Sequence, residues 1–236
     1  MRKRTLPNYL LNGIIDLLFP NICACCSCRL AEGENRLCIF CRQERFEFAP
    51  VVYEPEDEIL PELIAFRVSL WEFNEGGVLQ ELIHMLKYRQ LYDLGIDFGL
   101  ELGKIVQNRF QAGGWGWNYD PFLVPVPLFR KSERKRGYNQ ARAIAEGVSR
   151  RAGWGVVKKR CVVRVRQTRS QTGLNARQRK ENVEGAFKIR GLKILEQEMP
   201  VIVDDVYTTG ATTFELAGVL KNAGARRVAI ATLAEA

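Results

Sequence analysis

The chain has 236 residues, of which 47% are hydrophobic and 26% are charged. This composition excludes a wholly disordered protein, and the length allows one α/β domain with a smaller appendage. Lysines and arginines number 35 against 27 aspartates and glutamates, and the net charge of +8 favours anionic partners such as phosphates or nucleic acid.

The first segment, Met1–Phe19, begins with basic residues and then turns apolar. Its leucines and isoleucines recur at helical spacing and polar residues interrupt it, so we expect an amphipathic helix rather than a signal peptide. No other stretch approaches the roughly 20 apolar residues of a membrane span. We therefore expect a cytoplasmic protein without a membrane span.

Six of the seven cysteines follow this segment closely. Four of them form two Cys-x-x-Cys pairs, which are Cys23/Cys26 and Cys38/Cys41. In a cytosolic protein this spacing predicts a tetrahedral zinc site rather than disulfides. Cys25 and Cys28 have the same spacing, so the choice of the first pair stays open, and an iron–sulfur cluster is the weaker alternative for four thiolates.

The stretch Arg42–Glu62 contains prolines and many acids and is typical of a linker. We place the domain boundary near Pro50. Residues 1–50 are then an N-terminal helix with a four-cysteine zinc module, and residues 51–236 are a larger domain.

In the larger domain, short apolar runs alternate with helical periods, which predicts an α/β fold with a central parallel sheet flanked by helices. The expected strands are Ile64–Phe73, Phe122–Pro127, Cys161–Arg166, Gly185–Ile189, Val201–Val203 and Arg227–Leu233. The expected helices are Gly77–Tyr88, Leu94–Phe110, Asn139–Ala152 and Thr212–Asn222. Leu128–Gln140 is expected to be a basic loop ahead of a helix, and Gln167–Val183 shows no core pattern.

The segment Val201–Thr213, VIVDDVYTTGATT, combines a buried strand, two acids, a Thr/Gly loop and the start of a helix. Ligands of parallel sheets bind outside the carboxyl ends of the strands, and a loop that enters a helix favours a phosphate. Gly210 lets the backbone approach closely, and the threonines can add hydroxyl donors. Asp204 and Asp205 lie where they can accept hydrogen bonds from sugar hydroxyls.

This segment resembles the phosphoribosyl pyrophosphate (PRPP) signature of type I phosphoribosyltransferases. The resemblance implies that Asp204 and Asp205 bind the ribose hydroxyls and that Mg²⁺ accompanies PRPP. It also implies a set of residues around the 5-phosphate, which are Val206, Tyr207, Thr208, Thr209, Gly210, Ala211 and Thr212.

The basic loop supplies further candidates for phosphate binding, among them Arg130 and Arg136. In type I phosphoribosyltransferases the loop after the equivalent strand contacts pyrophosphate, although these cations suit a nucleic-acid backbone or a solvated loop as well. Arg164–Phe187 matches the place of a mobile loop that closes over such sites, and an ordinary surface loop is the alternative.

Several motifs in order along the chain are similar to the ComF-like competence family. These are FPNICACC, LCIFC, LIHMLKYR, VPVPLFRKSERKRGYNQ, RQTRSQTGLNARQRKENVEGAF and VIVDDVYTTGATT. The resemblance implies a type I phosphoribosyltransferase fold that is linked to DNA uptake in natural transformation and handles incoming single strands in the cytoplasm beside a helicase. It also favours Cys23 and Cys26 as the first metal pair, because they follow Phe-Pro-x-x.

Two functions fit these observations. One is a phosphoribosyltransferase that uses PRPP and an acceptor that the sequence does not identify. The other is a non-catalytic nucleotide- or DNA-binding adaptor of a competence helicase, in which the same site binds a phosphoribosyl ligand without turnover.

Overall fold

The computed structural model describes residues 20–44, 51–53, 61–72, 77–88, 91–167 and 176–236. The chain divides into two compact units, Met1–Phe46 and Glu47–Ala236. The expected N-terminal helix Met1–Phe19 and the expected boundary at Pro50 lie outside the described residues. Among the described residues, no helix is long and apolar enough to cross a bilayer.

The described part of the first unit consists of turns and one short helix, α2 (Ile39–Glu44). Ile22 and Arg29 form an antiparallel bridge that closes a tight turn. The apolar residues buried in residues 20–44 are Cys23, Leu37, Cys38 and Cys41. One leucine cannot form a hydrophobic core within residues 20–44, so this stretch needs a cross-link such as a structural metal to fold stably.

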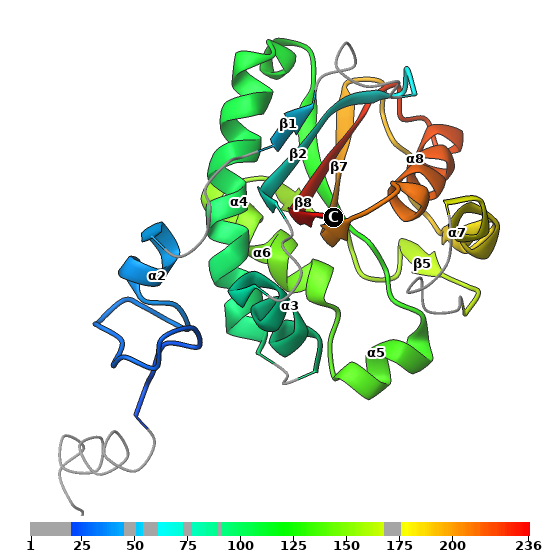
Figure 1. Ribbon diagram of the computed structural model, residues 1–236. Helices are drawn as coiled ribbons and strands as arrows, with labels where there is room; N and C mark the ends of the chain where they lie inside the picture. The colour runs from blue at the N-terminus through cyan, green and yellow to red at the C-terminus, as the bar shows by residue number, and fades with distance from the viewer. Residues whose placement is uncertain (1–19, 45–50, 54–60, 73–76, 89–90, 168–175) are drawn as a thin grey trace, which may run out of the picture. The chain divides into compact units, whose positions relative to one another are not determined.

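A six-stranded sheet forms the centre of the second unit (Figure 1). Its strands, in spatial order, are β1 (Val51–Tyr53), β2 (Ile64–Glu72), β8 (Val228–Glu235), β7 (Glu198–Tyr207), β3 (Asp120–Pro125) and β4 (Gly155–Val156). β1 is antiparallel to β2 at one edge, and the other neighbours are parallel. The predicted parallel sheet is therefore confirmed.

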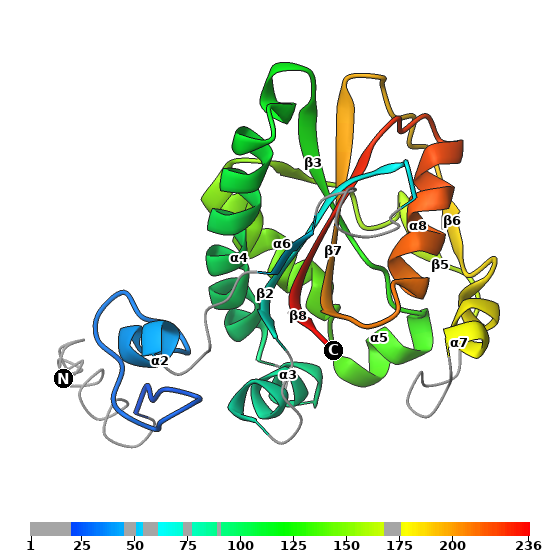
Figure 2. The same ribbon diagram turned by 45° about the horizontal axis from the view of Figure 1, so that its top comes forward.

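Helices cover both faces of this sheet (Figures 1 and 2). α4 (Tyr92–Ala112) and α6 (Gln140–Ala152) lie side by side against one face, and α8 (Ala211–Asn222) covers the other. α4 and α6 approach so closely that a Cβ on Gly99 would lie 2.1 Å from the carbonyl oxygen of Ile144. α3 (Val78–Tyr88) lies beside the carboxyl ends of the strands.

The basic segment is not the loop that the sequence predicts. It forms a helix, α5 (Arg130–Arg136), which ends at Gly137 with a φ of +84° in the left-handed region. Arginine, lysine and glutamate are good helix formers, and a glycine in the left-handed region is a common helix end. In the segment Gln167–Val183, the described part contains a further helix, α7 (Ala176–Val183).

β7 is longer than the expected strand Val201–Val203. It continues to Tyr207 because Asp204 and Val206 pair with Thr232 and Ala234 of β8. The two acids therefore belong to the strand itself. β5 (Val162–Arg164) and β6 (Phe187–Ile189) form a separate antiparallel pair.

Candidate functional site

The segment Val201–Thr213 lies at the carboxyl edge of the sheet, where β7 runs between β8 and β3. Val201–Val203 are fully buried, whereas Asp204 and Asp205 are half-buried. A short turn then leads into α8, which begins at Ala211. The structure thus brings the two carboxylates, the Thr/Gly loop and a helix N-terminus together, as the sequence predicts.

Gly210 gives the loop its shape. Its φ of +70° is in the left-handed region, and a Cβ there would lie 2.5 Å from both the Tyr207 hydroxyl and the Phe214 ring. Its carbonyl accepts hydrogen bonds from Thr213 Oγ1 at 3.0 Å and from the Phe214 amide at 2.8 Å. The backbone therefore turns sharply into α8, whose first amides and dipole favour an anion such as phosphate.

The two acids differ in their surroundings. The Asp205 amide donates to Asp204 Oδ1 at 2.9 Å, and Asp205 Oδ2 forms an ion pair with Lys87 Nζ at 2.9 Å. Burial and the charge of Asp205 raise the pKa of Asp204 to about 7, while the Asp205 amide, Lys87 and Arg164 act in the opposite direction. The site thus contains one carboxylate held by a cation and one that titrates near neutral pH.

Lys87 is a site residue that sequence reasoning does not assign. It lies in the last turn of α3, which Tyr138 anchors by donating a hydrogen bond to the Leu86 carbonyl at 2.6 Å. Burial alone would lower the pKa of Lys87, but the carboxylates of Asp205 and Asp204 raise it. Lys87 is therefore a fixed cation at the acid pair. The LIHMLKYR motif contains this residue, so the resemblance is the signal that could have identified it.

Arg67 is a second residue that sequence reasoning misses. It is fully buried on β2, its guanidinium lies 3.9 Å from the centre of the Tyr207 ring, and its Nη1 lies 2.9 Å from Glu235 Oε1. Tyr207 directly precedes the loop and also packs edge-on against Phe214. Arg67 thus fixes the base of the loop through Tyr207.

The structure separates the two predicted arginines of α5. Arg136 is half-buried, donates to Gln140 Oε1 at 2.9 Å and lies close enough to Lys87 to oppose its protonation. Arg130 is exposed and lines a basic cavity together with Arg164. Arg136 therefore lies near Lys87, the cation that pairs with Asp205, whereas Arg130 belongs to the neighbouring cavity.

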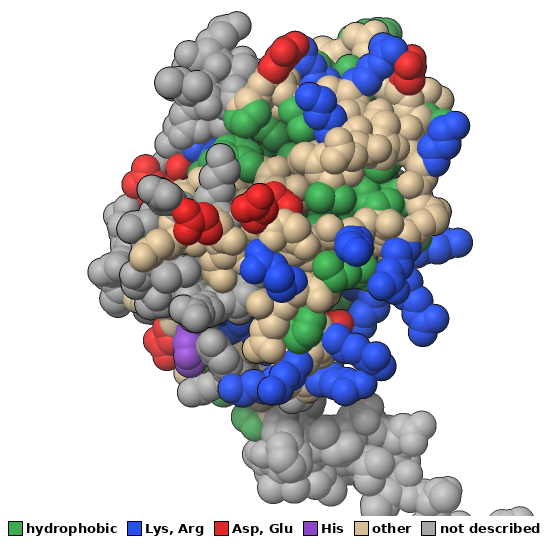
Figure 3. Space-filling view, turned by 90° about the vertical axis from the view of Figure 1, so that its right-hand side faces the viewer, with side chains coloured by type: hydrophobic (Ala, Val, Ile, Leu, Met, Phe, Trp, Pro, Cys, Tyr) green, Lys and Arg blue, Asp and Glu red, His purple; other side chains and the backbone are tan. Residues whose placement is uncertain are grey.

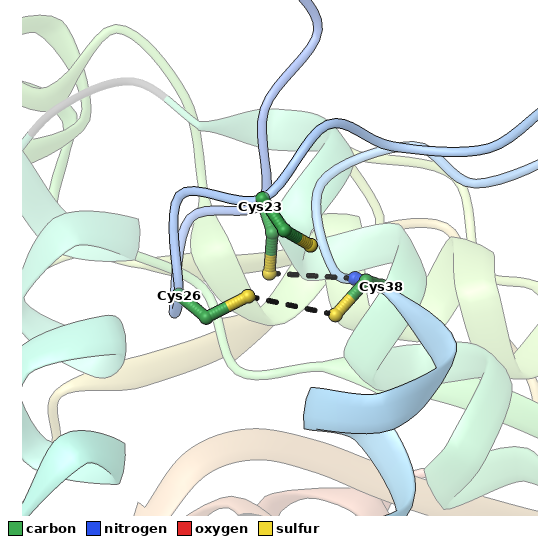
Figure 4. A group of neighbouring side chains, drawn as sticks. Cys23, Cys26 and Cys38 are labelled. Carbon is green, nitrogen blue, oxygen red and sulfur yellow. Dashed lines mark hydrogen bonds between the residues drawn. The ribbon is translucent and has the colours of Figure 1, made fainter.

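In the first unit, the sulfur atoms of Cys23, Cys26, Cys28 and Cys38 lie within 4.8 Å of one another. Figure 4 shows three of them, and Cys26 Sγ and Cys38 Sγ are 3.7 Å apart. Zinc–sulfur bonds of about 2.3 Å in a tetrahedron place the sulfurs about 3.8 Å apart, so the spacing fits zinc. Backbone amides of Cys25 and Cys38 donate to Cys23 Sγ, each at 3.4 Å, which suits a thiolate.

This group shares three members with the predicted quartet and contains Cys28 in place of Cys41. Cys41 is fully buried, and its amide donates to Cys38 Sγ at 3.4 Å. Burial and hydrogen bonds with neighbouring cysteines raise the pKa of Cys41, whereas hydrogen bonds with Cys28 lower the pKa of Cys26 to about 6. Cys41 therefore packs against the same cluster, and the fourth ligand remains a prediction.

Comparison with known proteins gives the family. Residues 135–236 match the phosphoribosyl transferase domain. The chain is 35% identical over 120 residues to Competence protein F of Haemophilus influenzae, covering 48% of this chain and 50% of the relative. It is 34% identical over 155 residues to DNA utilization protein YhgH of Escherichia coli, covering 64% of this chain and 65% of the relative.

These alignments span only half to about two thirds of the length of the two relatives. A longer match, to DNA utilization protein YhgH of Salmonella typhi, is 29% identical over 231 residues and covers 91% of this chain and 96% of the relative. Together with the sheet and its flanking helices, the matches confirm the predicted family and fold. The chain is a ComF-like protein with a phosphoribosyltransferase fold.

Proposed function

We propose that the protein binds PRPP, or a related phosphoribosyl ligand, at the carboxyl edge of its sheet. In this proposal the 5-phosphate lies at the turn that contains Gly210 and at the first turn of α8, and the ribose hydroxyls donate to Asp204 and Asp205. The observation that carries the proposal is the left-handed turn directly behind two half-buried carboxylates. It sets an anion site beside acceptors for sugar hydroxyls.

The pyrophosphate end of PRPP lies near the cations that face the acid pair. When the ligand binds, Lys87 leaves its ion pair with Asp205 and contacts the pyrophosphate, and Arg136 adds a second positive charge. Asp204 and Asp205 also offer the oxygen donors that Mg²⁺ prefers. Mg²⁺, when bound with PRPP, would neutralise part of the pyrophosphate charge.

Binding supports two functions. In a transferase, an acceptor atom bonds to the anomeric carbon as the bond to the pyrophosphate oxygen breaks, and pyrophosphate leaves with the electron pair. Lys87 and Arg136 then stabilise the leaving group. In the alternative, the site binds the ligand without turnover, and the protein is an adaptor of a competence helicase. Release of pyrophosphate in the presence of acceptors separates the two.

Isothermal titration with PRPP and Mg²⁺ tests the site. Saturable binding is expected for the wild type, and a loss of at least tenfold in affinity is expected for Asp204→Asn with Asp205→Asn, because about 1.4 kcal/mol corresponds to tenfold. Asp120→Asn is the control, since this exposed carboxylate lies at the opposite end of the sheet. Unchanged affinity in the double variant would refute the site.

We also propose that the cysteine cluster binds a structural zinc ion. Cys23, Cys26 and Cys38 are ligands in either quartet, and Cys41 or Cys28 completes the site. Cys38→Ser should lose the metal, as measured by metal analysis, and should destabilise the first unit. Cys161→Ser in the second unit should keep its full zinc content. Comparison of Cys41→Ser with Cys28→Ser identifies the fourth ligand, and full zinc content in Cys38→Ser would contradict the proposal.

The names of the relatives, Competence protein F and DNA utilization protein, suggest the process in which the ligand is used. We propose that this chain acts in DNA uptake and handles incoming single-stranded DNA in the cytoplasm, where zinc-binding thiols stay reduced. A helicase is a candidate partner in the same process.

A further inference from the structure

A large basic cavity lies beside the site, between α5 and β5. Its volume is about 890 Å³, and eight lysines and arginines but one acid line it. The basic residues are Arg130, Arg134, Arg142, Lys158, Lys159, Arg160, Arg164 and Arg190, and the acid is Glu133. Figure 3 faces this side of the domain and shows lysine and arginine side chains gathered over its lower half.

Most of these cations have no acidic partner. Lys159 Nζ lies 2.6 Å from Glu133 Oε1, and Arg142 Nε lies 3.3 Å from Glu146 Oε1. In the part of the chain that the structure describes, no ion pair is formed by Arg130, Arg134, Lys158, Arg160 or Arg190. Because like charges repel, cations concentrated around one cavity indicate an anionic occupant.

The size and lining of the cavity indicate what kind of anion it takes. Sites of this volume for small molecules are mostly apolar, with few polar groups, whereas this one carries cations on several segments. Among the described residues that line it, none is aromatic, so bases have nothing to stack on and the phosphates would be recognised. A volume of 890 Å³ corresponds to a space about 10 Å across, which is too narrow for a duplex, because its major groove alone is about 12 Å wide.

The cavity adjoins the phosphoribosyl site. Pro125, which lines the cavity, pairs with Val203 of β7, and Val203 directly precedes Asp204. Arg164 lines the cavity and is also close enough to Asp204 to favour its ionised form. An anion in the cavity would therefore lie next to the ribose.

We propose that this cavity binds the sugar–phosphate backbone of single-stranded nucleic acid and places the strand next to the bound phosphoribosyl ligand. The inference rests on the proposed function, and it assigns the single-stranded DNA a binding surface in the second unit. Recognition is through phosphates and is therefore independent of base sequence. The five cations without ion pairs are the contacts that a strand would make.

The test uses the full-length protein, a fluorescent oligothymidylate of about 16 nucleotides and anisotropy at several salt concentrations. Five phosphate contacts predict a slope of log K against log[salt] of about −3.5, or a loss of about 100-fold in affinity between about 50 and 200 mM salt. Lys158→Gln with Arg160→Gln removes two contacts, so the slope should fall to about −2 and the loss to about 20-fold.

Lys193→Gln with Lys221→Gln is the matched control, because both lysines are exposed and neither lines the cavity. It should keep the wild-type slope, and a second cavity variant, Arg134→Gln with Arg190→Gln, should repeat the effect of the first. Equal slopes in cavity and control variants would overturn the proposal, as would equal affinity for a duplex or full displacement of the strand by equimolar inorganic pyrophosphate. PRPP titration in parallel distinguishes the two proposals. If PRPP does not bind but the cavity variants still lower the salt slope, only the phosphoribosyl site is refuted.

Discussion

Asp204 is a carboxyl that the folded protein holds in an unfavourable environment. We expect Asp204→Asn to raise the free energy of unfolding of the ligand-free protein, and we expect this gain to grow as the pH rises. Burial and the charge of Asp205 raise the pKa of Asp204 from 3.8 to about 7. Asparagine has a similar shape but no charge to bury, so the substitution removes the penalty.

The sign follows from proton binding in the two states. Below pH 3.8 the carboxyl is protonated in both the folded and the unfolded chain, and it carries no penalty. Between pH 3.8 and about 7 the unfolded chain releases the proton while the folded chain keeps it, so the free energy of unfolding falls. The span of about three pH units corresponds to about 4 kcal/mol, and partial solvent exposure and coupling to Asp205 reduce this to roughly 2 kcal/mol.

Denaturant unfolding near pH 5 and near pH 8 measures the effect. The variant should exceed the wild type by roughly 2 kcal/mol near pH 8 and by less than half of that near pH 5. Asp120→Asn is the control, because it removes a carboxylate at the opposite end of the sheet. A gain that is independent of pH, or a loss of stability near pH 8, would refute the account of Asp204.

Three further substitutions test other parts of the structure. Gly99→Ala should destabilise the domain by about 1–3 kcal/mol in denaturant unfolding, because its methyl group meets the Ile144 carbonyl, whereas Gly218→Ala, whose methyl meets nothing within 4 Å, should stabilise it by about 0.5–1 kcal/mol. Gly210→Ala should weaken PRPP binding at least tenfold in calorimetry, since a left-handed residue with a Cβ costs about 1–2 kcal/mol before its clashes are counted. Lys87→Met should move the pH profile of PRPP binding to higher pH, because Lys87 lowers the pKa of the neighbouring carboxyl, and an unchanged midpoint would contradict this role.

Most elements of the second unit could be predicted because their signals are local. The apolar periods of α4 and α6 and the apolar run of β2 lie within one or two residues of the observed ends. α5 could not be predicted in this way, because none of its seven residues is apolar and the segment therefore has no hydrophobic periodicity. The length of β7 depends on its pairing with β8, which is a non-local effect.

The candidate site was predictable where its residues belong to recognisable motifs. The loop and both carboxylates lie in one motif, so they are close in space because they are close in the sequence. Lys87 and Arg67 reach the motif from α3 and β2, and only the fold brings them there. For Arg67 a signal did exist, because a charged residue inside the apolar run IAFRVSLW is seldom fully buried without a role.

Arg164 lies between two regions of opposite charge, the acid pair and the basic cavity. Its pKa is lowered by burial and by the nearby Arg166 and Arg136, while Asp204 opposes that change. If a nucleic-acid strand binds in the cavity, its phosphates compete for Arg164 and weaken the stabilisation of ionised Asp204. The pyrophosphate of PRPP is attracted by the same cations, so the two proposed ligands should oppose each other. Because such coupling is reciprocal, PRPP should weaken strand binding by the same factor by which the strand weakens PRPP binding.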